Sequence, residues 1–337
     1  MARSSDPQPG SQEWLDIVVE DVVDPDAPIV DPHHHLWPDG AGMQYALADL
    51  DADLGSGHNV VDTVFVECGA SYRRGASDDT APLGETEFVA GEAVRSQRQV
   101  MGGIVAHADL RRAERLDELL DAHDAAGAGR FRGIRHAGSH ALHPEVLMIA
   151  GRAPVDLYAD PAFRAGVARL GERGLTFDTW HYHYQNREFA ALARSVPGTT
   201  LVLDHFGTPL GVGPYASQRE HIFEQWKADV AEIAACDNVV AKVGGLAMPD
   251  NGFGWNTADR PPTSDEFVGA QRRYYEHTIE QFGPDRCMFE SNFPVDRLSL
   301  SYRTLWNAFK KMIVEYSDAE RDAMLRGTAA RVYRLGV

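Results

Sequence analysis

The chain has 337 residues, of which 44% are hydrophobic and 24% are charged. This composition is typical of a globular protein and excludes disordered and fibrous classes. Asp and Glu number 50 against 32 Lys and Arg, which gives a formal charge of −18. The average field of such a protein repels phosphate backbones and anionic lipids. We therefore expect a small-molecule partner and neither nucleic acid nor a membrane.

The cysteines and the first residues give expectations about the compartment. Cys68, Cys236 and Cys287 are widely spaced and form no Cys-x-x-Cys pair, so neither a disulfide framework nor a zinc ribbon is indicated. The first residues lack the basic start and the apolar run of a secretory signal, and no segment approaches about 18 consecutive apolar residues. The cytoplasm is the expected location.

Residues 1 to about 27 are polar and rich in Pro and Asp, and we expect them to form an N-terminal arm. From residue 28 to residue 337, short apolar runs alternate with stretches of helical spacing, which predicts a single domain. The apolar runs predict eight strands, at Ile29–Val30, Val61–Val66, Val100–Val105, Phe131–Ile134, Leu175–Phe177, Leu201–Leu203, Val239–Val243 and Cys287–Phe289.

A strand followed by a helix, repeated about eight times without a change of composition, favours an α/β fold of the closed (β/α)8 barrel type over an open sheet. No Gly-x-Gly-x-x-Gly follows the first strand, and no P-loop motif occurs. Irregular stretches near 137–160, 207–219 and 247–262 are predicted to be loop insertions that wall a pocket. The predicted helices are Glu85–Arg98, Arg112–Ala125, Pro161–Arg173, Glu188–Ser195, Glu220–Ala235 and Thr263–Phe282.

Ionisable or amide side chains follow the predicted strands. Side chains alternate along a strand, so His33 and His35 at the end of the first strand point to the same side. Two imidazoles spaced in this way can chelate one divalent ion, so both are predicted metal ligands. The other strands are followed by Glu67 and Cys68; His107 and Asp109; Arg135 and His136; Asp178, His181 and His183; Asp204 and His205; Lys242; and Glu290, Asn292 and Asp296.

In a barrel these strand ends face one mouth, so the polar groups are expected to converge there as an active site. The loop residues His140 and His143 can reach a ligand in that mouth. The histidines of the predicted helices, His123, His221 and His277, are expected to lie on the surface. The residues expected to wall a ring-shaped ligand are Trp37, Trp180, Tyr182 and Phe293.

Five segments occur in an order that is typical of one family. They are Asp31-x-His33-x-His35-Leu36-Trp37, Gly133-Ile134-Arg135-His136, Leu203-Asp204-His205-Phe206-Gly207-Thr208-Pro209, Lys242-Val243-Gly244-Gly245-Leu246, and Met288-Phe289-Glu290-Ser291-Asn292-Phe293-Pro294. On these segments the chain resembles the amidohydrolase superfamily, in its amidohydrolase-related branch (amidohydrolase 2) of lactonases and related decarboxylases. The resemblance covers nearly the whole chain and implies a distorted TIM barrel.

The resemblance also implies a divalent metal, most often zinc, held by a first-strand pair of histidines, a fifth-strand His and an eighth-strand Asp. By position, His33 and His35 match the pair. His183 or His181 matches the fifth-strand ligand, with His183 preferred. His205 matches the sixth-strand His that often acts in catalysis.

This chain departs from the family at the eighth strand, where Asn292 stands in place of the usual Asp. An amide cannot accept a proton at neutral pH, so Asn292 cannot serve as the general base. Three possibilities follow: the metal is held more weakly, another carboxylate acts as the base, or the reaction needs no metal. Glu290, two residues away on the same side of the strand, is the first candidate for the base.

The leading hypothesis is hydrolysis of a small, carboxylate-bearing lactone or of a related ester or amide. A divalent ion, or Lys242 with Arg135, would polarise the carbonyl, and His205 or Glu290 would activate water, with Glu67 a lesser option. Arg135 is also suited to a bidentate grip on a substrate carboxylate. The other residues predicted to contact the substrate are His136, His107, Trp37 and His181.

Two alternatives stay open at this stage. One is non-oxidative decarboxylation of an aromatic or unsaturated acid, which releases CO2 without incorporating water oxygen. The other is a homologue that binds a ligand without turning it over after the change to Asn292. The many titratable groups at the strand ends favour an enzyme. A homodimer is also possible, because barrels with long apolar loops often pair.

Overall fold

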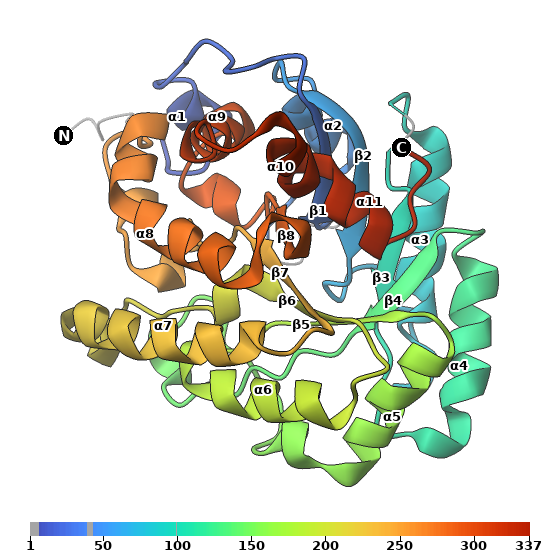
Figure 1. Cartoon of the computed structure of the whole chain (residues 1–337). Coiled ribbons are helices and arrows are strands. Elements are labelled where there is room, and N and C mark those ends of the chain that lie inside the picture. The colour runs from blue at the N-terminus through green and yellow to red at the C-terminus, as the bar shows by residue number, and fades with distance from the viewer. Residues whose placement is uncertain (1–6, 39–42, 99) are drawn as a thin grey trace, which may run out of the picture.

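The computed structural model describes residues 7–38, 43–98 and 100–337. At its centre lies one sheet of eight parallel strands in the order β1 to β8, with α3 to α8 arranged around its outside (Figure 1). The strands are β1 (Pro28–His34), β2 (Asn59–Val66), β3 (Gly103–Ala106), β4 (Phe131–Arg135), β5 (Thr176–Thr179), β6 (Leu201–Leu203), β7 (Val239–Val243) and β8 (Cys287–Phe289).

All six helices predicted from the sequence are present, and others precede and follow them. The helices are α1 (Gln12–Leu15), α2 (Leu47–Leu54), α3 (Leu83–Arg95), α4 (Ala113–Ala126), α5 (Pro161–Glu172), α6 (Asn186–Ser195), α7 (Arg219–Ala234), α8 (Ser264–Phe282), α9 (Tyr302–Met312), α10 (Asp318–Asp322) and α11 (Thr328–Val332). The sequence contains clear start signals for several of them. For example, Thr263 caps α8 by accepting from the backbone N–H of Glu266.

Backbone contacts between the first and last strands close the barrel. His34 pairs with Phe293 in a parallel bridge. The N–H of His35 donates to the carbonyl of Phe293 at 2.8 Å, and the N–H of Asn292 donates to the carbonyl of His33 at 2.9 Å. The eight strands therefore form a nearly closed barrel, and the predicted (β/α)8 fold is confirmed.

The C-terminal segment closes the end of the barrel where the strands begin. Arg334 donates to the carbonyls of Gly174 and Arg132, which lie just before β5 and within β4. Side chains from six strands meet this segment in one buried cluster inside the barrel. The cluster consists of Val30, Val64, Val66, Val105, Val202, Val240 and Met288 from the strands, with Ala329, Val332 and Tyr333 from the C-terminal segment.

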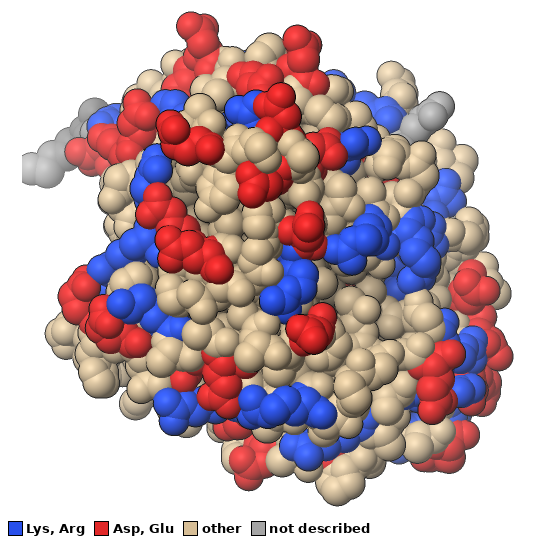
Figure 2. Space-filling model, in the orientation of Figure 1, with Lys and Arg blue, Asp and Glu red and all other residues tan. Residues whose placement is uncertain are grey.

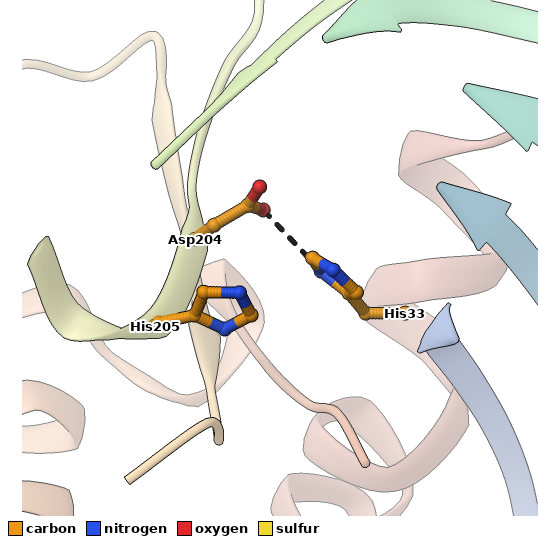
Figure 3. A group of neighbouring side chains, drawn as sticks. All are labelled: His33, Asp204 and His205. Atoms are coloured by element: carbon orange, nitrogen blue, oxygen red, sulfur yellow. Dashed lines mark ion pairs between the residues drawn. The ribbon is translucent and has the colours of Figure 1, made fainter. Parts of the chain in front are cut away.

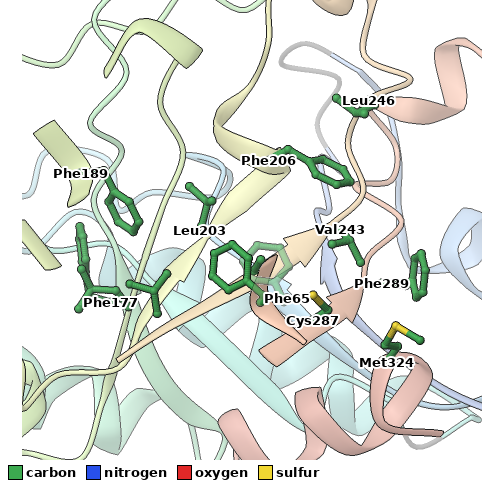
Figure 4. Packing of buried hydrophobic residues seen from close by; sticks show 14 of the residues in the cluster. Phe65, Phe177, Phe189, Leu203, Phe206, Val243, Leu246, Cys287, Phe289 and Met324 are labelled. Atoms are coloured by element: carbon green, nitrogen blue, oxygen red, sulfur yellow. The ribbon is translucent and has the colours of Figure 1, made fainter. Parts of the chain in front are cut away.

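A second apolar layer lies between the strands and the helices. Phe65, Phe177, Leu203, Val243 and Phe289 extend from the strands into this layer (Figure 4). They alternate with the residues that point into the barrel, as strand geometry requires. The two layers hold the strands rigidly, so the residues that follow each strand have fixed positions.

On the face drawn in Figure 2, acidic and basic side chains are interspersed. The acidic excess of the chain is therefore not gathered into one patch on this face. Among the described residues, no helix has both the length and the apolar character needed to cross a lipid bilayer.

The start of the third strand and the predicted exposure of one histidine differ from the structure. The third strand begins at Gly103, not Val100, because side chains of β2 take the preceding backbone N–H groups: Met101 donates to Thr63 and Gly102 donates to Asp62.

The expectation that the helical histidines lie on the surface is wrong for His123, which is fully buried on α4. Its ring nitrogens contact the Thr86 hydroxyl at 2.8 Å and the His107 carbonyl at 3.0 Å. Burial lowers the pKa of His123 to about 4. The helix is amphipathic, and His123 lies on the face that packs against α3.

Replacing Tyr333 by Phe should destabilise the fold. The Tyr333 hydroxyl donates to the buried carboxylate of Asp178, and losing a donor to a buried charge should lower the free energy of unfolding by about 1–3 kcal/mol. Urea unfolding followed by circular dichroism measures this change. Tyr316→Phe, at a half-buried tyrosine with no side-chain hydrogen bond among the described residues, is the matched control. Equal effects of the two substitutions would contradict the prediction.

Candidate active site

A cavity of about 750 Å3 opens at the C-terminal ends of the strands. Residues that follow the strands and residues of the stretches 137–160 and 247–262 form its walls. Its volume suits a small-molecule ligand. The predicted site residues that line it are His35, Trp37, Glu67, His107, Arg135, His136, His205 and Asn292.

Three side chains with metal-ligand chemistry meet beside this cavity. His33 comes from β1, and Asp204 and His205 come from the turn that follows β6 (Figure 3). Each offers one ligand atom, and these atoms all lie within 4.8 Å of one another. All three residues are buried. This group can bind a metal ion.

The backbone after β6 is held in an unusual conformation that directs His205. His205 and Phe206 have φ angles of +54° and +58°, a region that residues other than glycine adopt rarely and that is common at functional sites. Gly245 packs directly against the His205 ring, because a Cβ at position 245 would lie 2.3 Å from Nδ1. The position therefore requires glycine.

Glu290, which follows β8, joins two of the imidazoles. Its Oε1 lies 2.7 Å from His205 Nδ1, and its Oε2 lies 2.7 Å from His33 Nδ1. Burial alone would raise the pKa of this carboxyl, but the two histidines hold it at about 2. The ionised carboxylate accepts a hydrogen bond from His205 Nδ1. Its other oxygen faces His33 Nδ1, which also lies 3.2 Å from Lys242 Nζ. The His205 ring therefore presents its Nε2 as a free base or ligand atom.

A second set of buried charges surrounds Lys242. Its Nζ lies 3.0 Å from Asp178 Oδ2 and 3.0 Å from Asp204 Oδ1. Burial opposes the charge of this lysine, but the two carboxylates raise its pKa above the ordinary value. In turn, Lys242 is the first of the neighbours that lower the pKa of Asp204 against the effect of burial. Lys242 is fully buried and does not line the cavity.

Arg135 lines the cavity but already has an internal partner. Its Nε donates to Glu67 Oε1 at 2.9 Å, and its Nη2 donates to the Glu67 carbonyl. Its Nη1 lies 3.8 Å from Asp204 Oδ2. A substrate carboxylate would have to compete with Glu67 for this guanidinium.

His33 and His35 have the arrangement of a chelating pair. Their Nε2 atoms lie 3.2 Å apart. His35 Nδ1 contacts the Val66 carbonyl at 2.8 Å and therefore carries the proton, so His35 Nε2 presents a lone pair toward His33 Nε2. Two neutral imidazoles with Nε2 atoms this close can bind one cation together, so the donor set fits a divalent metal. Arg135 Nη1, 3.4 Å from His33 Nε2, weakens that affinity.

The Asn292 side chain is oriented by a neighbouring carboxylate. Its Nδ2 donates to Asp296 Oδ1 at 2.9 Å, which leaves the amide oxygen as its available acceptor at the cavity. Asp296 also accepts from the backbone N–H of Ala247 at 3.1 Å, and burial raises its pKa to about 7. An aspartate at position 292 would place two carboxylates in contact. The amide is the side chain that fits beside Asp296.

The two candidates for the fifth-strand ligand lie outside the group around His33. His181 contacts the Tyr158 hydroxyl and the Asn186 side-chain oxygen, each at 3.0 Å. His183 Nδ1 accepts from the backbone N–H of Leu210 at 3.3 Å. Burial lowers the pKa of both histidines to about 4. The structure thus brings neither ring to His33, and Asp204 and His205 lie there instead.

The aromatic wall is formed by three of the four residues expected for it. Trp37, Trp180 and Tyr182 line the cavity, whereas Phe293, His140 and His143 do not. Phe293 is buried against Tyr302. His140 is held by the Ala153 carbonyl at 2.9 Å.

Sequence reasoning did not assign a site role to three carboxylates that the structure places there. Asp178, Asp204 and Asp296 each contact a predicted site residue. All three were visible as polar residues after strands. What the sequence does not reveal is which of these carboxylates pairs with Lys242 and which with Asn292.

The sequence model of the family described as Amidohydrolase matches residues 30–335. This chain belongs to the amidohydrolase family. It is 34% identical over 331 residues to the uncharacterized protein y4mH of Sinorhizobium fredii, which covers 92% of this chain and 99% of that protein. It is 26% identical to an L-fucono-1,5-lactonase of Burkholderia multivorans, over 91% of this chain and 96% of the lactonase.

Solved structures of an amidohydrolase from Burkholderia multivorans have the same fold. One, with bound HEPES, has a TM-score of 0.71 at 27% identity. Another, with bound zinc, has a TM-score of 0.70 at 26% identity. Each match covers 92% of this chain and 100% of the solved chain.

Asn292→Asp should destabilise this protein increasingly as the pH rises. Two carboxyls in contact raise their pKa in the folded state, and a carboxyl whose pKa is raised by folding loses stability as the pH rises from about 4 to its folded value. We expect a loss of roughly 1–3 kcal/mol at pH 8 and less at pH 5, measured by thermal unfolding.

The exchanged double variant Asn292→Asp/Asp296→Asn is the control for that prediction. It restores one amide and one carboxylate with the hydrogen bond reversed, and should recover most of the stability. A single variant as stable as the parent at pH 8 would show that residues 292 and 296 do not interact.

Proposed function

We propose that the protein hydrolyses a small, carboxylate-bearing lactone, or a related ester or amide. The observation that carries this proposal is the His205–Glu290 pair at the cavity. A buried, ionised carboxylate holds one nitrogen of an imidazole and leaves the other free, which is the arrangement of an oriented general base. Membership of the amidohydrolase family and the likeness to an L-fucono-1,5-lactonase support the same reaction class.

In this reaction, His205 Nε2 takes a proton from a water molecule as the water oxygen attacks the substrate carbonyl carbon. The ring C–O bond then breaks, and the imidazolium returns its proton to the departing alkoxide, so that the product is a hydroxy acid. Glu290 holds the ring and stabilises its protonated form. Arg135 lines the cavity, and its Nη1, the one guanidinium nitrogen that is not bonded to Glu67, stabilises the negative charge that develops on the carbonyl oxygen.

We further propose that zinc is the metal and that His33 and His35, with Asp204, hold it. A bound divalent ion supplies Lewis-acid polarisation of the carbonyl. The paired Nε2 atoms of His33 and His35 support this assignment, as does the zinc in the Burkholderia multivorans structure. The small-molecule partner and the homodimer stay predictions.

The reaction is tested with a panel of aldonolactones and acidic lactones, followed by proton release with a pH indicator. His205→Asn and Glu290→Gln should each lower kcat/KM by about 10²- to 10⁴-fold, because the base is lost or its free nitrogen is no longer defined. His221→Asn, at an exposed histidine on α7, is the matched control and should retain full activity.

Other outcomes of this panel discriminate the alternatives. If the protein releases CO2 from aromatic or unsaturated acids and opens no lactone, its function is decarboxylation and not hydrolysis. Ligand binding without turnover of either kind would indicate a homologue that has lost its chemistry.

The metal is tested by elemental mass spectrometry of protein reconstituted with zinc. About one zinc ion per chain is expected, because the Nε2 atoms of His33 and His35 lie 3.2 Å apart and can bind one ion together. His33→Ala should lose it, and His183→Ala should retain it. Zinc that persists in His33→Ala, or disappears only in His183→Ala, would refute the ligand assignment.

A further inference from the structure

The arginine side chains that line the cavity are hydrogen-bonded to carboxylates, with one exception. Arg135 donates to Glu67, as described above. Arg111 donates to both carboxylate oxygens of Asp109, at 2.9 Å from Nε and 2.8 Å from Nη2. The exception is Arg152, which lines the cavity and has no ion pair and no side-chain hydrogen bond among the described residues.

The carboxylates of the cavity wall are also occupied. Glu67 holds Arg135. The two oxygens of Asp250 accept from the backbone N–H groups of Met148 and Ile149, at 2.7 Å and 3.0 Å. In the part of the chain that the structure describes, Arg152 is therefore the one arginine of the lining whose N–H groups are free for an anion, although the whole chain carries a charge of −18.

The backbone that carries Arg152 is fixed on both sides. Six consecutive residues, 149–154, line the cavity. On one side, Tyr182 donates to the Ile149 carbonyl at 3.0 Å and accepts from the N–H of Gly151 at 2.7 Å. On the other side, the N–H of Ala153 donates to the Ser139 carbonyl at 2.9 Å. Arg152 itself pairs with His140 in an antiparallel bridge.

This segment is therefore a rigid wall and not a free loop. An unpaired arginine on a flexible surface segment would lose conformational entropy when it binds an anion. Here the backbone is already ordered, so only the side chain must be positioned. The guanidinium offers two parallel N–H donors to a carboxylate.

We propose that Arg152 binds the carboxylate of the substrate and makes the enzyme prefer an acidic lactone over a neutral one. This inference rests on the proposed hydrolysis for its reaction. The sequence assigned the substrate carboxylate to Arg135, but Glu67 already occupies that side chain. We assign the carboxylate instead to Arg152, in the stretch 137–160. Arg152 is thus a specificity residue at the cavity wall, away from the proton transfer at His205.

The test compares D-glucaro-1,4-lactone, which carries a carboxylate, with neutral D-glucono-1,4-lactone. Arg152→Ala should raise KM for the acidic lactone about 10- to 100-fold, the loss expected for a charged hydrogen-bond pair. Its kcat should change by less than about twofold. KM for the neutral lactone should stay unchanged, and Arg152→Lys should be intermediate because one of two parallel bonds is lost.

Arg260→Ala is the matched control, because it removes the same charge from an exposed residue that does not line the cavity. It should alter neither KM. The proposal is overturned if Arg152→Ala raises KM for both lactones equally, or if Arg260→Ala reproduces the selective effect.

A binding measurement separates this proposal from the proposed reaction. Glutarate has two carboxylates and no bond to hydrolyse, and its affinity is measured by isothermal titration. Binding that falls at least tenfold in Arg152→Ala but not in Arg260→Ala supports the anion site even if no lactone is turned over. Lactone turnover with glutarate binding and KM ratios that are unaffected by Arg152→Ala refutes the anion site and leaves the hydrolysis standing.

Discussion

The buried charges at the centre of the barrel must balance one another, and the site depends on that constraint. Asp178, Asp204 and Glu290 have no exposure to water. Lys242 lies beside both aspartates, Arg135 lies near Asp204, and the imidazoles of His205 and His33 compensate Glu290. Removing one partner from such a set leaves an uncompensated buried charge, which costs several kcal/mol. The same arrangement keeps Glu290 ionised, and Glu290 in turn determines which nitrogen of His205 is free. Stability and chemistry therefore draw on the same contacts.

The positions of these groups follow from the fold. Parallel strands deliver eight chain segments to one mouth, and two packed apolar layers hold those segments in place. Local backbone conformation then sets the direction of individual side chains. His205 and Asn292 both adopt positive φ angles of +54°. Gly245 lets the His205 ring approach more closely than any side chain at 245 would allow. A rigid scaffold with a few strained residues at strand ends is a common basis for precise catalytic geometry.

The sequence predicts the architecture well and the site in part. Strand-and-helix alternation is a local pattern, so the eight strands and six helices are visible in it. The convergence of His33, His35, Arg135 and His205 follows once the barrel is assumed. The partners are harder, because pairs such as Asn292 with Asp296 or Lys242 with Asp178 depend on distances that spacing does not specify. His123 shows the same limit, since its burial depends on which helix face meets α3.

The contacts that close the barrel have a thermodynamic consequence. The seam between β1 and β8 is made by the backbones of His33, His35, Asn292 and Phe293, and the side chains of the first three also belong to the site. Any molecule that touches both sides of this seam binds the closed barrel and not the opened one. Binding of such a molecule therefore raises the free energy needed to open the barrel. Fraying of the seam would release the ligand and separate the two strands in a single cooperative event.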